Sequence, residues 1–254
     1  MTGLFDLTGR TALVTGSSLG IGYALAEGLA SHGARIVLNG RDAARLDRAA
    51  AALRAQDHDV HALAFDVTDP AAIAAAVSRI EAEIAPLDIL VNNAGMQHRA
   101  PLEQFPAEKW EELLRTNISS VFHVSQAVAR RMLERGRGRI INVASANAEL
   151  ARTGVAPYAA TKGALRNLTR GMAADWARRG LQVNAIAPGY FRTPLNAALT
   201  ASRDFTDWLE ARTPAGRWGE LDELKGAAIF LASDAASFVN GHMLHVDGGL
   251  TVSL

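Results

Sequence analysis

Residues 11–22 read TALVTGSSLGIG, an apolar run of strand length that leads directly into a glycine-rich turn. Gly16, Gly20 and Gly22 stand at the spacing G-x-x-x-G-x-G. Glycines between a first strand and a first helix allow a tight turn and a close approach of the backbone to a pyrophosphate, whose charge is favoured at a helix N-terminus. Glycines that merely close a turn would look alike in isolation, but this position predicts a dinucleotide-binding loop. The residues expected to form it are Gly16, Ser17, Ser18, Leu19, Gly20, Ile21 and Gly22.

The pattern of a buried strand followed by a helix continues along the chain. Near-continuous Val, Ile and Leu runs are typical of strands covered on both faces, and so of a parallel sheet between helices. We therefore predict an α/β fold of the doubly wound (Rossmann) type, with three layers and seven mostly parallel strands. No Pro/Gly/Ser-rich linker divides residues 1–254, so a single domain is expected. The expected strands are 11–16, 34–40, 60–67, 87–95, 138–145, 181–189 and 242–249.

Residues 190–218, YFRTPLNAALTASRDFTDWLEARTPAGRW, interrupt this alternation. The segment is polar and aromatic, follows a predicted strand, and is long enough for a pair of short helices. Open α/β sheets bind ligands outside the carboxyl ends of their strands, and insertions there often carry function. We predict that this segment is a lid over the substrate.

The composition excludes several classes of function. The 254 residues carry no net charge and are 49% hydrophobic and 20% charged, so a globular chain is expected, without an overall field that attracts nucleic acid or an anionic membrane. The sequence has no cysteine, which excludes disulfides, thiolate metal sites and a cysteine nucleophile. It also shows neither a basic-then-apolar leader nor an apolar run of about 18 residues, and we expect a cytoplasmic protein. His242 and His245 would face opposite sides of a predicted strand, so no metal site is expected.

The end of the second predicted strand distinguishes the two nicotinamide dinucleotides. Folds that bind NAD place an acidic residue there for the ribose 2′-hydroxyl, whereas a 2′-phosphate requires a cation. Here the acid position is Gly40, preceded by Asn39 and followed by Arg41, which can hold a phosphate through two hydrogen bonds. Asp42 could cap the next helix or reach the ribose. The stretch favours NADP(H) over NAD(H), unless Arg41 is simply a surface arginine.

Tyr158 and Lys162 stand at positions i and i+4 of a predicted helix, and therefore on the same side of it. A tyrosine with a pKa of about 10 is a poor base at neutral pH, and lowering that pKa by about 3 units requires roughly 4 kcal/mol. A positive charge about 4 Å away supplies on the order of 4 kcal/mol at an effective dielectric constant near 20. Lys162 is thus able in principle to activate Tyr158, although an exposed Tyr/Lys pair would show the same spacing. Ser145 ends a predicted strand, where its hydroxyl can bond a substrate oxygen or cap a turn.

Together these features resemble the short-chain dehydrogenase/reductase family. The resemblance rests on Thr15-Gly16-x-x-x-Gly20-x-Gly22, Asn92-Asn93-Ala94-Gly95, Asn117, Ser145, Tyr158-x-x-x-Lys162 and Pro188-Gly189, in this order over nearly the whole chain. It implies hydride transfer between a nicotinamide and a carbonyl or secondary alcohol carbon, with Tyr158 as acid/base and Lys162 on the nicotinamide ribose. Ser145 would bind the substrate oxygen, and Asn117 would hold a water that relays protons, unless it is simply a satisfied helix asparagine. Further cofactor contacts that the family implies are Asp66 (or a helix cap), Val67, Asn93, Ala94, Gly95, Pro188, Gly189 and Thr193.

Within the family, the stretches FDLTGRTALVTGSS, VLNGRD, PGYFRTPLN and RTPAGRWG are similar to dehydrogenases that interconvert a sugar acid and its keto form. A 3-oxoacyl-(acyl carrier protein) reductase is the alternative, and a dinucleotide sensor without turnover is a third. The resemblance implies a homotetramer built through helices over about 101–135 and 157–179 and the last strand. A sugar acid needs a cation for its carboxylate, and the sequence does not rank the candidates Arg99, Arg152 and Arg192. Polar residues expected near the substrate are Gln97, Asn147, Glu149 and Tyr190.

Overall fold

One parallel sheet runs through the structure. The computed structural model describes residues 3–253, and within them seven strands lie in the order β3-β2-β1-β4-β5-β6-β7, with every neighbouring pair parallel. The predicted doubly wound α/β fold is confirmed, and the sheet is entirely rather than mostly parallel. The strands are shorter than the apolar runs, because every run except that of β2 continues into a loop beyond the end of its strand. They are β1 (Thr11–Val14), β2 (Arg35–Gly40), β3 (Val60–Ala64), β4 (Ile89–Asn92), β5 (Gly138–Val143), β6 (Leu181–Pro188) and β7 (Met243–Val246).

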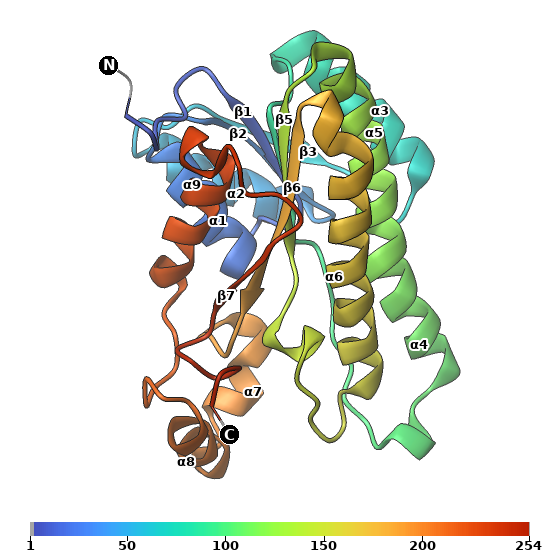
Figure 1. The fold of residues 1–254 in the computed structure, drawn as a ribbon, viewed down its shortest axis with the longest axis vertical. Helices are drawn as coiled ribbons and strands as arrows, with labels where there is room; N and C mark the ends of the chain where they lie inside the picture. Colours follow the sequence, from blue (N-terminus) through green and yellow to red (C-terminus); the bar gives the residue numbers. More distant parts are fainter. Residues whose placement is uncertain (1–2, 254) are drawn as a thin grey trace.

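Helices cover both faces of this sheet. Figure 1 shows α1, α2 and α9 on one face and α3, α4, α5 and α6 on the other. Asp42 and Asp69 cap α2 and α3, because each carboxylate accepts hydrogen bonds from backbone N–H groups of the first turn. The helices are α1 (Gly20–Ala30), α2 (Ala43–Arg54), α3 (Pro70–Arg79), α4 (Ala107–Leu114), α5 (Ser120–Arg135), α6 (Ala156–Trp176), α7 (Ala197–Thr200), α8 (Arg203–Arg212) and α9 (Lys225–Ala232).

The strands bury side chains on both faces, as the apolar runs predict. In β1, Ala12 and Val14 belong to the core beneath α1, α2 and α9, whereas Leu13 belongs to the core beneath α3, α5 and α6. In β2, Leu38 and Val37 divide in the same way, and all five side chains are fully buried. Each buried Val or Leu contributes roughly 1.5–3 kcal/mol. The two cores therefore hold the sheet rigidly, and the loops at its edge start from fixed points.

The strand order reverses between β1 and β4. From β1 the chain moves outward to β2 and β3, and then returns to place β4 on the other side of β1. Loops that leave the carboxyl ends of β1 and β4 consequently run to opposite faces, and a crevice opens between them. The carboxyl ends of β2, β5 and β6 lie at the same edge of the sheet. This topology brings segments from the whole chain to one edge.

Residues 190–218 contain the predicted pair of short helices. Figure 1 shows α7 and α8 together at the end of the molecule that also holds the C-terminus. Trp218 is 1% exposed, and the ring centroids of Tyr190 and Phe205 lie 6.0 and 5.9 Å from its ring. Trp208 is 43% exposed and completes the cluster, with its ring 5.2 Å from that of Phe205. These aromatic contacts lie within the segment and join α8 to the two ends of residues 190–218.

The helix expected over 101–135 is divided into parts. Pro106 precedes α4, which begins only at Ala107, and a π-helical turn at Arg115–Ser119 separates α4 from α5. Such a turn accommodates an extra residue and is frequent at functional sites, and here it contains Asn117. Within residues 3–253, no helix is both long enough and apolar enough to cross a membrane.

Candidate active site

The loop after β1 forms a cradle that requires glycine at two positions. Gly16 has a φ of +61°, and a Cβ there would lie 2.8 Å from the Cα of Ala94. A Cβ on Gly22 would lie 2.3 Å from the Nδ2 of Asn93. The N-cap residue of α1, Leu19, makes no side-chain cap, and the first turn carries no acidic residue. The N-terminal N–H groups of α1 are therefore available to an anion, which fits the pyrophosphate of a dinucleotide.

A cleft of about 790 Å³ extends from this cradle along the carboxyl edge of the sheet. Most of the predicted cofactor residues line it, and so does Ser145. Ser17 does not: its side chain is fully buried, and its hydroxyl donates to the carbonyl of Val14 at 2.7 Å. Ser17 shapes the turn from beneath. The predicted cofactor residues that line the cleft are Gly16, Ser18, Leu19, Gly20, Ile21, Gly22, Asn39, Gly40, Arg41, Asp66, Val67, Asn93, Ala94, Gly95, Tyr158, Lys162, Pro188, Gly189 and Thr193.

Tyr158 and Lys162 enter the cleft from the first turns of α6. The Lys162 ammonium lies 5.7 Å from the centroid of the Tyr158 ring and donates to the carbonyl of Val143 at 2.7 Å. Burial lowers the pKa of Lys162 to about 8. Burial also raises the pKa of Tyr158, against a hydrogen bond with Ser145 that lowers it. Among the groups of this chain, the loss of water on burial is the largest influence on the pKa of Tyr158. The activation of Tyr158 by Lys162, helped by the positive charge of an oxidised nicotinamide, stays a prediction.

Asn117 lies beneath the cleft, and its side chain is 1% exposed. Its Oδ1 accepts from the backbone N–H of Met96 at 2.9 Å, and its Nδ2 donates to the Met96 carbonyl at 3.0 Å and to the Thr161 hydroxyl at 3.1 Å. These bonds join the loop after β4 to α6. The π-helical turn places the Asn117 amide where it contacts both the loop after β4 and α6. Its side-chain oxygen and nitrogen both have partners in the protein, and the residue forms the floor of the cleft beside Gly95.

At the opposite end of the cleft, the open question about Asp42 is answered. Its carboxylate accepts from the backbone N–H of Arg45 at 3.0 Å, so Asp42 is the N-cap of α2. Arg41 and Arg45 both line the cleft. Arg45 is not among the residues predicted from the sequence, and its place in the first turn of α2, close to Arg41, is the signal that could have found it. Asp66 caps no helix: it accepts two hydrogen bonds from Thr68, whose backbone N–H is the largest cause of its lowered pKa.

The structure separates the three candidate arginines. Arg99 and Arg152 line the cleft, together with Gln97, Asn147 and Tyr190. Arg192 does not line it, because its side chain turns to Glu220 at 3.1 Å.

Glu149 likewise lies outside the cleft lining, where it pairs with Arg166 at 3.1 Å. Among the described residues, no group of three or more His, Cys, Asp or Glu side chains is arranged to hold a metal ion. The cleft thus joins an anion cradle to a phenol, a buried ammonium and two guanidinium groups, which suits proton transfer on an anionic substrate beside a dinucleotide.

Comparison with known proteins identifies the class. The family model described as enoyl-(acyl carrier protein) reductase matches residues 16–251. The chain belongs to the short-chain dehydrogenase/reductase family, and it is an oxidoreductase that acts on CH–OH groups.

Individual relatives give a more specific likeness than the family model does. The chain is 57% identical to a gluconate 5-dehydrogenase of Gluconobacter oxydans, over 99% of this chain and 98% of the relative. It is 49% identical to 5-keto-D-gluconate 5-reductase of Escherichia coli over the full length of both. A crystal structure of a gluconate 5-dehydrogenase from Burkholderia cenocepacia, in complex with NADP and tartrate, superimposes with a TM-score of 0.97 at 55% identity and covers 99% of this chain and 98% of that one.

Proposed function

We propose that the protein interconverts D-gluconate and 5-keto-D-gluconate with NADP(H). The observation that carries the proposal is the pair of guanidinium groups, Arg99 and Arg152, in the same cleft as Tyr158. A sugar acid offers a carboxylate for such cations and a secondary alcohol for the phenol. The relatives named above act on this pair of compounds and share about half of their residues with this chain over nearly its full length.

Each residue of the site has a role in the proton transfers of this reaction. When bound, the nicotinamide supplies the hydride chemistry. In reduction, Tyr158 donates its proton to the oxygen of the ketone, and in oxidation its phenolate accepts the proton of the alcohol. Ser145 steadies the charge on that oxygen. Lys162 holds the nicotinamide ribose and, when protonated, stabilises the phenolate of Tyr158.

The preference for NADP(H) rests on the end of β2. Gly40 offers no carboxylate to a ribose 2′-hydroxyl, and Arg41 and Arg45 provide cations beside the adenosine end of the cleft. The carboxylate of Asp42 is engaged as a helix cap. A 2′-phosphate therefore meets two guanidinium groups there, with one nearby acid already bonded to the backbone.

Steady-state assays test this function. We expect NADPH to be oxidised with 5-keto-D-gluconate at a higher kcat/KM than with any β-ketoacyl thioester, and NADH to serve less well. The thioester is the relevant rival, because the chain is 40% identical to a 3-oxoacyl-(acyl carrier protein) reductase of Escherichia coli over 96% of its length. Turnover of the thioester without turnover of the sugar acid would overturn the assignment. Binding of NADPH without turnover of any ketone would indicate a sensor.

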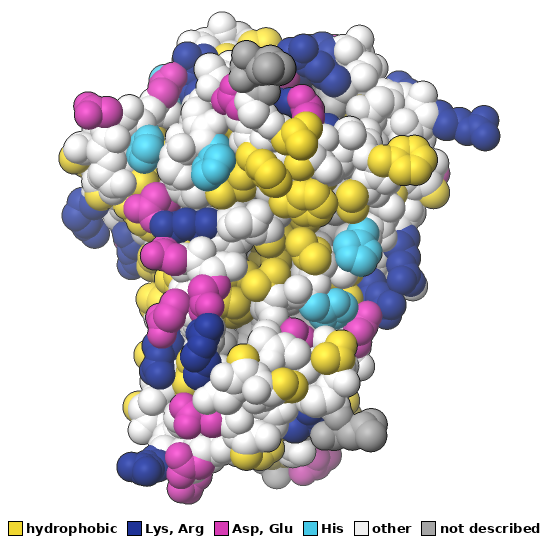
Figure 2. Space-filling model, turned by 60° about the vertical axis from the view of Figure 1, so that its left-hand side comes forward, with side chains coloured by type: hydrophobic (Ala, Val, Ile, Leu, Met, Phe, Trp, Pro, Cys, Tyr) yellow, Lys and Arg dark blue, Asp and Glu magenta, His cyan; other side chains and the backbone are white. Residues whose placement is uncertain are grey.

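We also propose that the chain assembles as a homotetramer. Figure 2 shows hydrophobic side chains gathered on the face that includes α9 and the C-terminal segment. Phe238, just before β7, is fully exposed, and on α4 and α5 Trp110 and Phe122 are 37% and 42% exposed. Apolar surface of this kind favours association. Light scattering should give four times the 27.0 kDa mass of one chain.

A further inference from the structure

The two ends of the cleft differ in charge balance. The acidic residues that line the cleft are Asp42, Asp66 and Glu112. Hydrogen bonds from Thr68 and Lys109 are the largest causes that lower the pKa of Asp66 and of Glu112, and the charge of Arg41 adds to both. At the other end lie Arg99 and Arg152, which form no ion pair with any described acidic residue within 4 Å. Their counter-charge must come from outside the chain.

These two guanidinium groups also act on each other. Partial burial lowers the pKa of Arg99, and the like charge of Arg152 lowers it further. Such an arrangement is unfavourable in the empty protein, and an anion between the groups relieves it. The substrate end of the cleft is thus built for an anionic group.

Arg152 is oriented by aromatic contacts. Its guanidinium carbon lies 5.0 Å from the centroid of Phe205 in α8 and 6.0 Å from that of Tyr190. An arginine stacked on rings keeps the N–H groups at its edge free for a planar, two-bonded contact with a carboxylate. Its buried Nε has no hydrogen-bond partner among the described residues. Arg99, in contrast, is exposed and bonds to Gln97 at 3.1 Å.

The substrate itself distinguishes the two arginines. In 5-keto-D-gluconate the reacting carbon is C5 and the carboxylate is C1, at the other end of an extended chain. Burial is the largest influence on both groups; beyond it, the charge of Arg99 lowers the pKa of Tyr158, and the phenols of Tyr190 and Tyr158 raise the pKa of Arg99. Arg152 stands instead against the aromatic cluster of the 190–218 segment. A cation held against the rings of the 190–218 segment suits C1, and one whose charge reaches the phenol suits the hydroxyls near C5.

We propose that Arg152, stacked on Tyr190 and Phe205, binds the substrate carboxylate and selects a sugar acid over its neutral analogue. This inference rests on the proposed function and assigns its substrate specificity to one residue. It also gives the 190–218 segment a role in substrate specificity, because α8 supplies one of the rings that hold the Arg152 guanidinium in place.

The matched substrates are 5-keto-D-gluconate and L-sorbose, which carries a CH₂OH group in place of the carboxylate. In Arg152→Gln, kcat/KM for the keto acid should fall about 10- to 100-fold, mainly through KM, as expected for a lost charge-assisted pair. The value for L-sorbose and the Kd of NADPH should stay within about twofold. Phe205→Leu should produce a smaller loss in the same direction. Arg192→Gln is the control, because Arg192 lies in the same segment but pairs with Glu220 outside the cleft.

Each alternative result has a definite meaning. An equal loss for both substrates in Arg152→Gln would show a structural role, and no loss for either would place the carboxylate elsewhere. Should L-sorbose be too poor a substrate to measure, the inhibition constant of L-tartrate decides: it should rise about 10- to 100-fold in Arg152→Gln and not in Arg192→Gln. An unchanged constant overturns the inference. Failure of the wild-type protein to reduce 5-keto-D-gluconate overturns the proposed function instead.

Discussion

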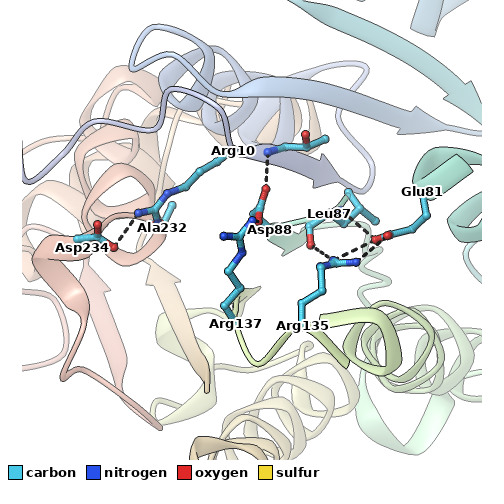
Figure 3. A network of polar contacts seen from close by, with 9 residues as sticks. Arg10, Glu81, Leu87, Asp88, Arg135, Arg137, Ala232 and Asp234 are labelled. Atoms are coloured by element: carbon cyan, nitrogen blue, oxygen red, sulfur yellow. Dashed lines mark hydrogen bonds and ion pairs between the residues drawn. The ribbon is translucent and has the colours of Figure 1, made fainter. Parts of the chain in front are cut away.

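Arginines gather at both edges of the sheet, and the two groups differ in their partners. At the amino edge, Figure 3 shows Arg10, Arg135 and Arg137 directed at acidic groups or at backbone carbonyls. At the carboxyl edge, the arginines of the cleft lack acidic partners within 4 Å in the described chain, apart from a 3.5 Å contact between Arg45 and Asp42. The ion pairs of the amino edge are Arg10–Asp234 (2.7 Å), Arg35–Asp59 (2.6 Å), Arg135–Glu81 (2.7 Å), Arg137–Asp88 (3.3 Å) and Arg139–Asp234 (3.4 Å).

In this chain of zero net charge, the paired arginines of the amino edge serve stability, and the unpaired arginines of the carboxyl edge serve function. Paired arginines tie loops together, whereas unpaired ones leave a local positive field that a ligand must neutralise. Substitutions of the unpaired arginines at the carboxyl edge should therefore change catalysis and leave folding intact, and substitutions of the paired arginines at the amino edge should do the reverse. Substitutions at both edges test that division, and the stability contributed by the buried Lys162 sharpens it, from the largest expected effect to the smallest.

The strongest test at the carboxyl edge is Tyr158→Phe. Loss of the acid/base hydroxyl should reduce kcat about 10²- to 10⁴-fold, with NADPH affinity and the midpoint of thermal unfolding nearly unchanged. Tyr190→Phe is the matched control, since Tyr190 lines the same cleft and burial raises its pKa as well. Stopped-flow assays at saturating substrate measure the effect. Comparable losses in the two variants would remove Tyr158 from the chemistry.

At the amino edge, Arg135→Met should reduce stability. The guanidinium of Arg135 bonds to both carboxylate oxygens of Glu81, at 2.7 and 3.1 Å, and to the carbonyl of Leu87 at 2.6 Å. Removing one partner of a largely buried pair costs about 2–4 kcal/mol. Urea unfolding should show this loss, with kcat per folded molecule unchanged. Arg137→Met is the control and should cost less than about 1 kcal/mol, because its side chain is 72% exposed.

Some functional residues at the two edges of the sheet can be predicted from the sequence, and others only from the fold. The glycine cradle and the Tyr158/Lys162 pair are local patterns, so the sequence could single them out, and the resemblance to the family then gave the pair its predicted role. The fates of Arg152 and Arg192 depend on distant residues: Arg192 finds Glu220 in another loop, and Arg152 finds the ring of Phe205. No local pattern encodes such partners, and the three candidate arginines therefore looked equivalent until the fold placed them.

The pH dependence of stability tests Lys162. Its pKa of about 8 in the folded protein lies below the 10.5 of an ordinary lysine, so between these values the unfolded chain binds more protons. Stability must then rise with pH from about 8 to 10.5, and the contribution is lost as the pH falls through 8. The unfolding free energy of wild type minus that of Lys162→Met should increase by about 2–3 kcal/mol across this window. A flat difference would mean that Lys162 keeps an ordinary pKa.

The smallest effect is expected for the cofactor preference set by Arg41. In Arg41→Ser, the KM for NADPH should rise about 10- to 30-fold, because one charge-assisted contact with the 2′-phosphate is lost, and the KM for NADH should stay the same. Arg45→Ser should produce a weaker shift in the same direction, since Arg45 is shared with Asp42 at 3.5 Å. Both variants should unfold like wild type, because neither guanidinium is buried in a pair within the described chain. A change in the KM for NADH as large as that for NADPH would show that Arg41 holds the adenosine as a whole, and the contrast between the two edges would then rest on Arg99 and Arg152 alone.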